Sequence, residues 1–151
     1  MIHYEFRKLD TETVNQLITL SRTWVEEDCC YGMVENEVSD LREPLVVAID
    51  GETIVGYAFG HVYTQEKHIS CIEAGKKCFS FDELYILPNY RGMGIGSMLF
   101  RMLEEKVSEE CAFLTLSTSA KNYKAILKLY IEELGMQFHS AFLFKNLEET
   151  T

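Results

Sequence analysis

The hydrophobic positions in the first half of the chain predict one helix followed by a two-stranded hairpin. In residues 10–30 apolar side chains recur at intervals of three and four, which is the spacing of one helix face, and Asp10 or Thr11 is suited to cap the start. Residues 45–50 form a continuous apolar run typical of a buried strand, and residues 53–63 read as the returning strand. The Asp-Gly pair between these two runs favours a tight turn.

The second half predicts strands and helices in alternation. It opens with an uneven, polar stretch at 64–78, which predicts a loop with at most a short strand. The elements expected after it are a strand at 79–87, a helix from about Gly92 to Ser108, a strand at 112–118, a helix at 121–134 that Gly135 ends, and a closing strand at 137–147. This order predicts an α/β (α+β) fold in which helices pack against a central sheet.

Length and composition predict a single domain over residues 1–151. The chain has 151 residues, of which 47% are apolar, enough for one hydrophobic core. No segment reaches the ~18 apolar residues of a membrane span, and the N-terminus lacks the apolar run of a signal peptide. Five cysteines, an odd number, with no sign of export favour a reduced, cytoplasmic setting.

Charge excludes one class of partner and favours another. The net charge is −10, and the chain shows no basic run that would form a nucleic-acid-binding face. An acidic surface suits a cationic partner such as an amine, although solubility alone also explains acidic composition.

A glycine-rich stretch, PNYRGMGIGSMLF at 88–100, carries the clearest chemistry. Arg91 precedes three glycines at alternate positions, just where the predicted strand passes into the predicted helix. The first amides of a helix lack internal partners and lie at the positive end of its dipole, and glycines let a ligand approach them closely. This combination predicts a phosphate site. The spacing fits neither a P-loop, which requires a lysine, nor the G-x-G-x-x-G dinucleotide fingerprint.

The same stretch resembles motif A of the GNAT superfamily of N-acetyltransferases. The family pattern [RQ]-x-x-G-x-[GA] is matched in full by residues 91–96, and the flanking LYILPNY and SMLF agree with it. The later segment LSTSAKNYKAILKLYIEELGM is similar to the family's distal strand and helix, so the resemblance covers about residues 45–147. It implies a GNAT-type mixed, mostly antiparallel sheet with helices on both faces, and acetyl-CoA as the cofactor.

The resemblance also implies which residues contact acetyl-CoA. The backbone of the strand before the motif would pair with the pantetheine arm, the motif amides would bind the pyrophosphate, and an asparagine at the start of the distal helix would contact the pantetheine amides or, alternatively, cap that helix. The residues expected in these roles are Leu84, Tyr85, Ile86, Arg91, Gly92, Met93, Gly94, Ile95, Gly96, Ser97 and Asn122.

Two acidic residues are candidates for the catalytic base that deprotonates the amine. By similarity Asp82 occupies the position of the carboxylate base of some members, and other members carry an acid at the position of Glu83. Adjacent strand residues face opposite ways, so only one of the two can point into a cleft unless a bulge intervenes. Asp82 is short, which makes relay through a water an option.

By similarity Tyr130 is the acid that protonates the CoA thiolate. Family members place this tyrosine seven residues after the asparagine, whereas Tyr130 lies eight after Asn122. One extra residue rotates the side chain by about 100°, which a π-bulge would absorb. Otherwise Tyr123 or water is expected to take the role.

The acceptor and some alternatives stay open. A small cationic amine such as a polyamine, an aminoglycoside or an amino-acid derivative is favoured over a protein N-terminus or lysine, and a non-catalytic acyl-CoA-binding module is the alternative from another class. The spacing of His68, Cys71 and Cys78 matches no zinc signature, so no metal is expected. The family often forms dimers, so a homodimer is one expected state.

Overall fold

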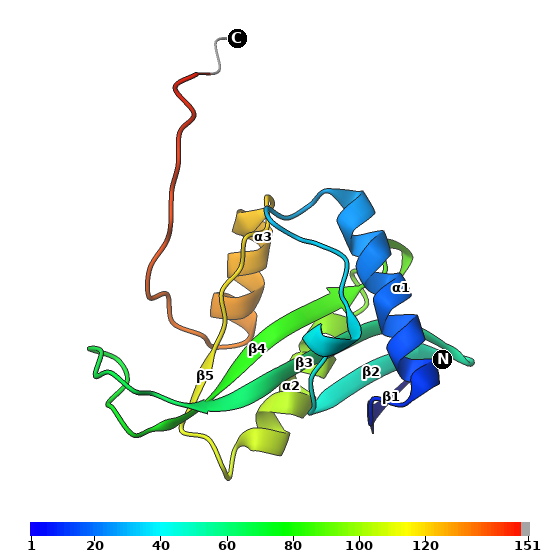
Figure 1. The fold of residues 1–151 in the computed structure, drawn as a ribbon, viewed down its shortest axis with the longest axis horizontal. Coiled ribbons are helices and arrows are strands. Elements are labelled where there is room, and N and C mark those ends of the chain that lie inside the picture. Colours follow the sequence, from blue (N-terminus) through cyan, green and yellow to red (C-terminus); the bar gives the residue numbers. More distant parts are fainter. Residues whose placement is uncertain (149–151) are drawn as a thin grey trace.

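The computed structural model describes residues 1–148, and Figure 1 shows a twisted sheet with helices packed on it. Within that range five strands form one sheet in the order β1-β2-β3-β4-β5. The pairs β1–β2, β2–β3 and β3–β4 are antiparallel, and the pair β4–β5 is parallel. The strands are β1 (Ile2–Arg7), β2 (Leu45–Asp50), β3 (Thr53–Thr64), β4 (Lys77–Ile86) and β5 (Phe113–Thr115).

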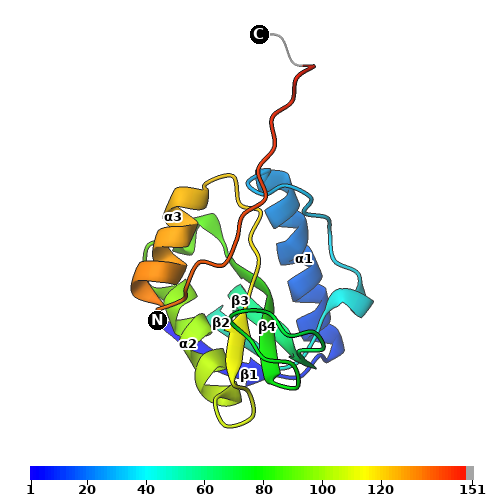
Figure 2. The same ribbon diagram turned by 90° about the vertical axis from the view of Figure 1, so that its left-hand side faces the viewer.

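Helices cover both faces of this sheet, as Figure 2 shows, with α1 on one face and α2 and α3 on the other. The helices are α1 (Thr11–Glu27), α2 (Ile95–Val107) and α3 (Tyr123–Lys128), which continues directly into a π-helical turn (Leu129–Glu133). The side chain of Asp10 caps α1 by accepting a hydrogen bond from the amide of Thr13 at 2.8 Å. The predicted fold class, a mixed and mostly antiparallel sheet between helices, is therefore confirmed.

The sheet supplies two cores because its central strands are buried on both faces. Along β2 and β3 the side chains alternate, so Val47 and Tyr57 pack toward α1 whereas Val46 and Ala58 pack toward α2. Leu17 is the fully buried residue that α1 contributes to the first core. This two-sided burial is why residues 45–50 read as a continuous apolar run instead of an alternating one.

The first strand and several boundaries differ from the sequence-based expectation. No strand was expected at the N-terminus, yet β1 pairs along its whole length with β2, from Ile2 opposite Asp50 to Arg7 opposite Leu45. The strand expected at 112–118 is shorter, because the chain leaves β4 after Thr115. The helix expected from about Gly92 begins three residues later, since Gly92 to Gly94 form a turn and α2 begins at Ile95.

The predicted closing strand at 137–147 is wrong. In the structure these residues form no strand, all of them are exposed, and none of their amides donates a backbone hydrogen bond within the described chain. An alternating apolar pattern reports the capacity to pair as a strand, but the pairing itself needs a free edge in reach. After Met136 the chain instead leaves the sheet and helices and extends away from them, as Figure 1 shows.

No helix within residues 1–148 combines the length and the apolar character that crossing a bilayer requires.

Candidate active site

The glycine-rich segment forms an open turn that exposes main-chain amides at the start of α2. Gly92 and Gly94 adopt left-handed backbone angles, with φ of 78° and 79°, and Gly94 is the N-cap of α2 without any side-chain cap. None of the amides from Gly92 to Ser97 donates to a protein acceptor in residues 1–148. A Cβ added at Gly94 would meet no atom within 4 Å, so the space before these amides is free.

The other residues of the motif hold this turn against the sheet. Ile95 is buried in the α2-side core, whereas Met93 is 60% exposed. A Cβ at Gly96 would lie 3.3 Å from Ile86 and 3.6 Å from Leu84, so the first turn of α2 rests directly on the end of β4. The apolar side chains of Leu84 and Ile86 therefore fix the height of the amides above the sheet.

Arg91 does not extend freely toward the turn but ties β4 to α1. Its Nε donates to the carbonyl of Ile86 at 2.9 Å, and its guanidinium pairs with Glu27 at 2.8 Å. Tyr85 donates its hydroxyl to the same carboxylate at 2.5 Å and stacks on Trp24 with ring centroids 4.9 Å apart. Burial, together with Glu27, raises the pKa of Tyr85 well above its usual value, so the phenol remains a donor.

Strands β4 and β5 diverge into a wedge beyond their short pairing. The two strands pair only between Cys78–Ser80 and Phe113–Thr115, so in the described chain no strand lies on the β5 side of residues 81–86. A hollow of about 430 Å³ opens where they part, lined by Tyr63, Ser80, Phe81, Asp82, Thr115, Leu116 and Ser117. The wedge leads from the open amides of α2 to the acidic residues of β4.

A β-bulge in β4 brings both acidic residues to the α1 face of the sheet. Glu83 lies opposite Phe59 and Phe81 lies opposite Gly60, which leaves Asp82 as the extra residue. Gly60 accommodates the bulge, since a Cβ there would come within 1.9 Å of the carbonyl oxygen of Ser80. The bulge that the sequence analysis named as the exception is therefore present, and strict alternation does not apply to these two carboxylates.

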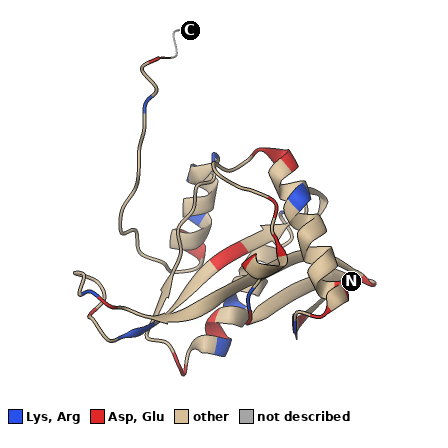
Figure 3. Ribbon diagram, in the orientation of Figure 1, with Lys and Arg blue, Asp and Glu red and all other residues tan. Residues whose placement is uncertain are grey.

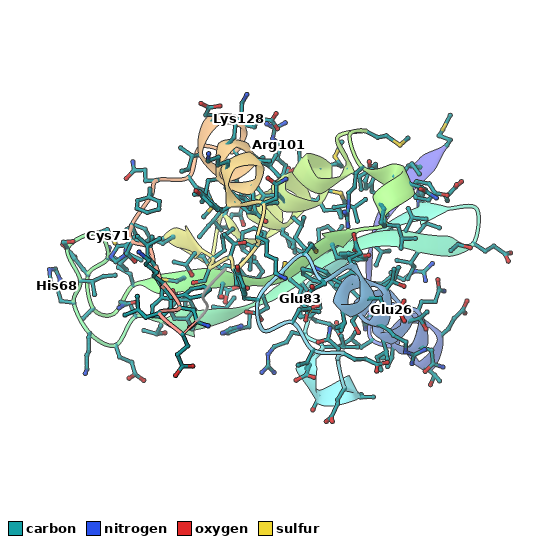
Figure 4. The ribbon with its side chains drawn as sticks, turned by 90° about the horizontal axis from the view of Figure 1, so that it is seen from above. Glu26, His68, Cys71, Glu83, Arg101 and Lys128 are labelled. Atoms are coloured by element: carbon teal, nitrogen blue, oxygen red, sulfur yellow. The ribbon has the colours of Figure 1, made fainter. Side chains whose placement is uncertain are left out.

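Glu83 is the more enclosed of the pair. Both of its carboxylate oxygens lie 2.8 Å from the side-chain amide of Asn36, and the hydroxyl of Tyr57 donates to one of them at 2.7 Å. Burial raises the pKa of Glu83, only partly opposed by these two hydrogen bonds, and the nearby charges of Asp40 and Asp82 raise it further. Figure 4 shows Glu83 beneath the segment that follows α1.

This raised pKa predicts a pH-dependent stability that Glu83→Gln removes. Because the folded protein holds the Glu83 proton more tightly than the unfolded chain, the contribution of Glu83 to stability falls as pH rises from the unfolded pKa to the folded pKa and is constant above it. The free energy of unfolding of wild type should thus decline relative to Glu83→Gln from about pH 4 upward. Urea denaturation at several pH values measures this difference in the free energy of unfolding. Glu52→Gln, in the exposed β2–β3 turn, is the control and should follow wild type. Parallel pH curves for wild type and Glu83→Gln would contradict the burial argument.

Asp82 pairs with His61, a histidine that was not predicted from the sequence as a catalytic residue. The Nδ1 of His61 lies 2.7 Å from one oxygen of Asp82, and Ser80 donates to the other oxygen at 3.2 Å. Both side chains are partly open to solvent, with 44% exposed for His61 and 25% for Asp82. A histidine that donates from Nδ1 to a carboxylate keeps Nε2 free as an acceptor. The only sequence signal for this pair was that His61 is a polar residue near the end of an apolar strand.

Tyr130 lies on the π-helical turn (Leu129–Glu133) that follows α3, so a π-bulge is present at this point of the chain. The amide of Leu134 donates to the carbonyl of Leu129 at 3.0 Å, which is the π-helical pattern. The ring of Tyr130 packs 6.1 Å from that of Phe100, and its hydroxyl has no hydrogen-bond partner among the described residues. Burial, with a smaller effect of Cys30, raises the pKa of Tyr130, so it stays protonated.

Asn122 is the N-cap of α3, but its side chain makes no capping hydrogen bond and is exposed. Its amide is thus available for other partners. Tyr123, the alternative to Tyr130, is exposed on the first turn of the same helix. His68 and Cys71 lie in the connection between β3 and β4, away from Glu83 (Figure 4), and no group of three metal-ligand residues occurs in the part of the chain that is described.

Sequence and structure comparisons agree on one family. The Acetyltransferase (GNAT) family profile matches residues 11–136, and a search of curated proteins gave no match. Similar solved structures include a predicted acetyltransferase with acetyl-CoA from Clostridium acetobutylicum (16% identity, 97% of each chain covered, TM-score 0.69). The ribosomal-protein-alanine N-acetyltransferase from Brucella melitensis biovar Abortus 2308 is 16% identical, with 97% of this chain and 99% of that chain covered and a TM-score of 0.66.

A third similar structure is the aminoglycoside acetyltransferase meta-AAC0020 from an uncultured soil metagenomic sample, at 17% identity, 97% of each chain covered and a TM-score of 0.67. At these identities the structures support the fold, and the family match carries the assignment. The predictions of an N-acetyltransferase and of acetyl-CoA as its cofactor are thereby confirmed at the level of the family. The chain belongs to the acetyltransferase (GNAT) family.

Proposed function

We propose that this protein transfers the acetyl group of acetyl-CoA directly to a small cationic amine, such as a polyamine, an aminoglycoside or an amino-acid derivative. The observation that carries this proposal is the arrangement along β4. One strand leads from the bulge with Asp82 and Glu83, past the open wedge, to the unbonded amides at the start of α2.

The amides of Gly92 to Ser97 fit the pyrophosphate of the cofactor. They are unbonded, they lie at the positive end of α2, and the space before Gly94 is free of protein atoms. Arg91 supports them by its bond to Ile86, and the wedge edge of Leu84, Tyr85 and Ile86 offers main-chain groups to the pantetheine arm. The side chain of Asn122, at the start of α3, is exposed and makes no capping hydrogen bond, so its amide is proposed to contact the pantetheine amides. When bound, acetyl-CoA supplies the activated acyl thioester.

The acceptor side is acidic, which supports a cationic substrate. Between Thr23 and Leu41 the chain carries Glu26, Glu27, Asp28, Glu35, Glu37 and Asp40 but neither lysine nor arginine. This segment follows α1 along the same face as the carboxylates of β4, and Figure 3 shows acidic colour both on the segment and in the middle of β4. Glu27, Asp28 and Glu35 pair with Arg91, Lys121 and Arg22 from other parts of the chain. The remaining acidic residues of the segment, together with the carboxylates of β4, leave an excess of negative charge that attracts an ammonium group.

Within this site His61 and Asp82 are proposed to take the proton of the amine. Asp82 lines the hollow and pairs with His61, whereas both oxygens of Glu83 already accept hydrogen bonds from Asn36 and one of them also from Tyr57. Asp82 orients the imidazole and stabilises it when it becomes charged, and Nε2 accepts the proton directly or through water. Glu83 then acts by positioning Asn36 and by adding negative charge.

Tyr130→Phe tests the proposed acid. The phenol is half-enclosed, protonated and unpartnered, so its loss should slow turnover by about 10-fold while the affinity for acetyl-CoA changes little. Steady-state kinetics and calorimetry measure the two effects, and Tyr123→Phe on the neighbouring helix turn is the control that should retain wild-type rates. If Tyr130→Phe is fully active, then Tyr123 or water protonates the thiolate.

A thiol-release screen tests the function itself. Purified protein with acetyl-CoA should release free CoA thiol with at least one polyamine, aminoglycoside or amino-acid amide, and the rate should rise with pH as the amine loses its proton. Peptides with a free N-terminus or a lysine belong in the same panel, because a preference for them would indicate that the acceptor is a protein and not a small amine. If the protein binds acetyl-CoA but releases no CoA thiol with any amine, it is a non-catalytic acyl-CoA-binding module.

The cytoplasmic setting is part of the same proposal. All five cysteines are free thiols, and the sulfur atoms of the adjacent Cys29 and Cys30 lie 4.0 Å apart, about twice the length of a disulfide. Free thiols are compatible with a reducing compartment.

A further inference from the structure

Two loops that lie far apart in the sequence, residues 28–31 and 119–121, are hydrogen-bonded to each other, and we name the pair of loops the strap. The amide of Lys121 donates to the carbonyl of Cys29 at 2.8 Å, and the amide of Tyr31 donates to the carbonyl of Ser119 at 3.0 Å. Figure 1 shows the loop after α1 reaching the chain just before α3. The strap therefore joins the helix on one face of the sheet to a helix on the other face.

Side chains strengthen the strap. The hydroxyl of Ser119 donates to the carbonyl of Tyr31 at 2.8 Å, and the ammonium of Lys121 lies 3.1 Å from the carboxylate of Asp28. The same ammonium lies 5.2 Å from the centroid of the Tyr31 ring. Because backbone and side chains of both loops take part, the strap is a specific contact that depends on the backbone of residues 28–31.

The strap completes a ring of contacts around the wedge between β4 and β5. At the narrow end the two strands pair as far as Ser80 and Thr115. At the other end Tyr85 of β4 donates its hydroxyl to Glu27, the last residue of α1, and the strap continues from there to the chain that follows β5. The thioester of acetyl-CoA is proposed to lie between these strands, so the closed strap holds it inside the ring; this step alone rests on the proposed function.

The strap contains two adjacent thiols, Cys29 and Cys30. Their sulfur atoms lie 4.0 Å apart, and both residues are partly exposed, so small reagents in solvent have access to them. The two residues also carry the backbone contacts of the strap, because Cys29 supplies the carbonyl that accepts from Lys121 and Cys30 forms an antiparallel bridge with Ala120. A change in the peptide between the two thiols therefore changes the strap directly.

We propose that Cys29 and Cys30 form a reversible disulfide with each other and that this disulfide opens the strap. The Cα atoms of adjacent residues are about 3.8 Å apart, less than the roughly 4.4–6.8 Å that a disulfide usually spans. Closing the ring thus twists the peptide between the two residues, which turns the carbonyl of Cys29 away from Lys121. A bond strained in this way is easily reduced, which suits a reversible signal and not a permanent link.

The oxidant is a low-molecular-weight disulfide, such as oxidised glutathione. In the first step a thiolate of the pair attacks the reagent, whose S–S bond breaks, so that a mixed disulfide forms on the protein and one glutathione thiol leaves. The second thiol then attacks the mixed disulfide, which closes the Cys29–Cys30 bond and releases the second glutathione thiol. The pair loses two hydrogens, and the reagent takes them up as two thiols. Burial, followed by the neighbouring Cys29, raises the pKa of Cys30, so the first attack is assigned to Cys29.

Mass spectrometry and hydrogen exchange of the full chain, treated with oxidised glutathione, test the proposal. The tryptic fragment 23–42 contains Cys29 and Cys30 and no other cysteine, and it should become lighter by two hydrogens. The amides of Tyr31 and Lys121 should exchange at least ~10-fold faster than in the reduced protein, and dithiothreitol should reverse both changes. Turnover of acetyl-CoA with an amine should fall by about 10-fold, because the open strap no longer holds the thioester.

Three serine variants provide the controls. Cys29→Ser and Cys30→Ser cannot close the ring, so the amide of Lys121 should stay protected in both after the treatment. Cys71→Ser removes the exposed cysteine of the β3–β4 connection, and this variant should respond as wild type does.

The proposal is overturned if fragment 23–42 keeps both hydrogens or ends as a stable mixed disulfide. It is also overturned if the disulfide forms while the amides of Tyr31 and Lys121 remain protected, or if Cys30→Ser loses this protection as wild type does, since an adduct would then open the strap. Unchanged turnover with an open strap would contradict its role in holding the thioester. Mass and exchange need no catalysis, so a reduced protein that transfers no acetyl group would contradict the proposed function alone.

Discussion

Replacing Gly94 with leucine should lower the affinity for acetyl-CoA by at least about 100-fold. The substitution acts in two ways. Gly94 has a φ of 79°, which costs a residue with a Cβ roughly 1–2 kcal/mol, so the turn tends to move. A side chain there also enters the free space before the amides of Gly92 to Ser97, where the pyrophosphate is proposed to bind. Isothermal titration calorimetry measures the loss.

Gly75→Leu provides a matched control. Gly75 also has a positive φ, 91°, and open space around a new Cβ, but it lies in the connection between β3 and β4, at the far end of the sheet from the glycine-rich segment. The control should lose a similar amount of stability in thermal melts and keep its affinity for acetyl-CoA. Equal affinity losses in the two variants would mean that strain alone is responsible, and unchanged affinity in Gly94→Leu would contradict the phosphate-binding role.

The second large effect is expected for Asp82→Asn, which should reduce kcat/KM for the amine by about 100-fold or more with little change in cofactor affinity. The substitution keeps the shape and removes the charge that orients His61 and stabilises it when protonated. His61→Gln should cause a loss of similar size. The double variant should be no worse than either single one, because the two residues act as a unit. Full pH–rate profiles with a fixed amine measure these effects.

Glu83→Gln is the informative neighbour for this experiment. Glu83 lies next to Asp82 on the same bulge, but its oxygens accept hydrogen bonds from Asn36 and Tyr57. Its loss should therefore reduce kcat/KM much less than that of Asp82, by about 10-fold at most, and its pH–rate profile should stay close to wild type. If the Glu83 variant is the inactive one and Asp82→Asn is active, the assignment of the base must be reversed.

The fold was largely predictable because its signals are local. The continuous apolar run of β2, the Asp-Gly turn before β3 and the capped, amphipathic α1 each follow from residues close in sequence. β1 was missed because its strand character depends on β2, which lies some forty residues further along the chain and pairs with it throughout. Its own sequence mixes charged and apolar residues, which a short edge strand tolerates.

The candidate site was predictable in its motif and less so in its contacts. The open turn at Gly92 and Gly94 follows from glycine's access to positive φ, and the extra residue before Tyr130 predicted a π-bulge as one of its two outcomes. The pairing of His61 with Asp82 could not be predicted, since it joins two strands and depends on the bulge that Gly60 permits. The engagement of Arg91 by Glu27 at the end of α1 is likewise a long-range contact.

Residues 137–147 show the limit of prediction from a sequence pattern. Their sequence predicts a strand correctly in the sense of composition and alternation, yet a strand forms only where a partner of suitable direction lies beside it. In the described chain residues 137–147 do not reach the position next to β5, so the strand predicted there does not form.

The most direct measurement of the central claim is an amide NMR titration of the labelled protein with acetyl-CoA. The amide resonances of Gly92 to Ser97 should show the largest shifts, in the direction of stronger hydrogen bonding, and the same shifts should appear with CoA, which carries the same pyrophosphate. Binding that leaves these resonances in place while others move, or an absence of any shift at saturating cofactor, would contradict the account.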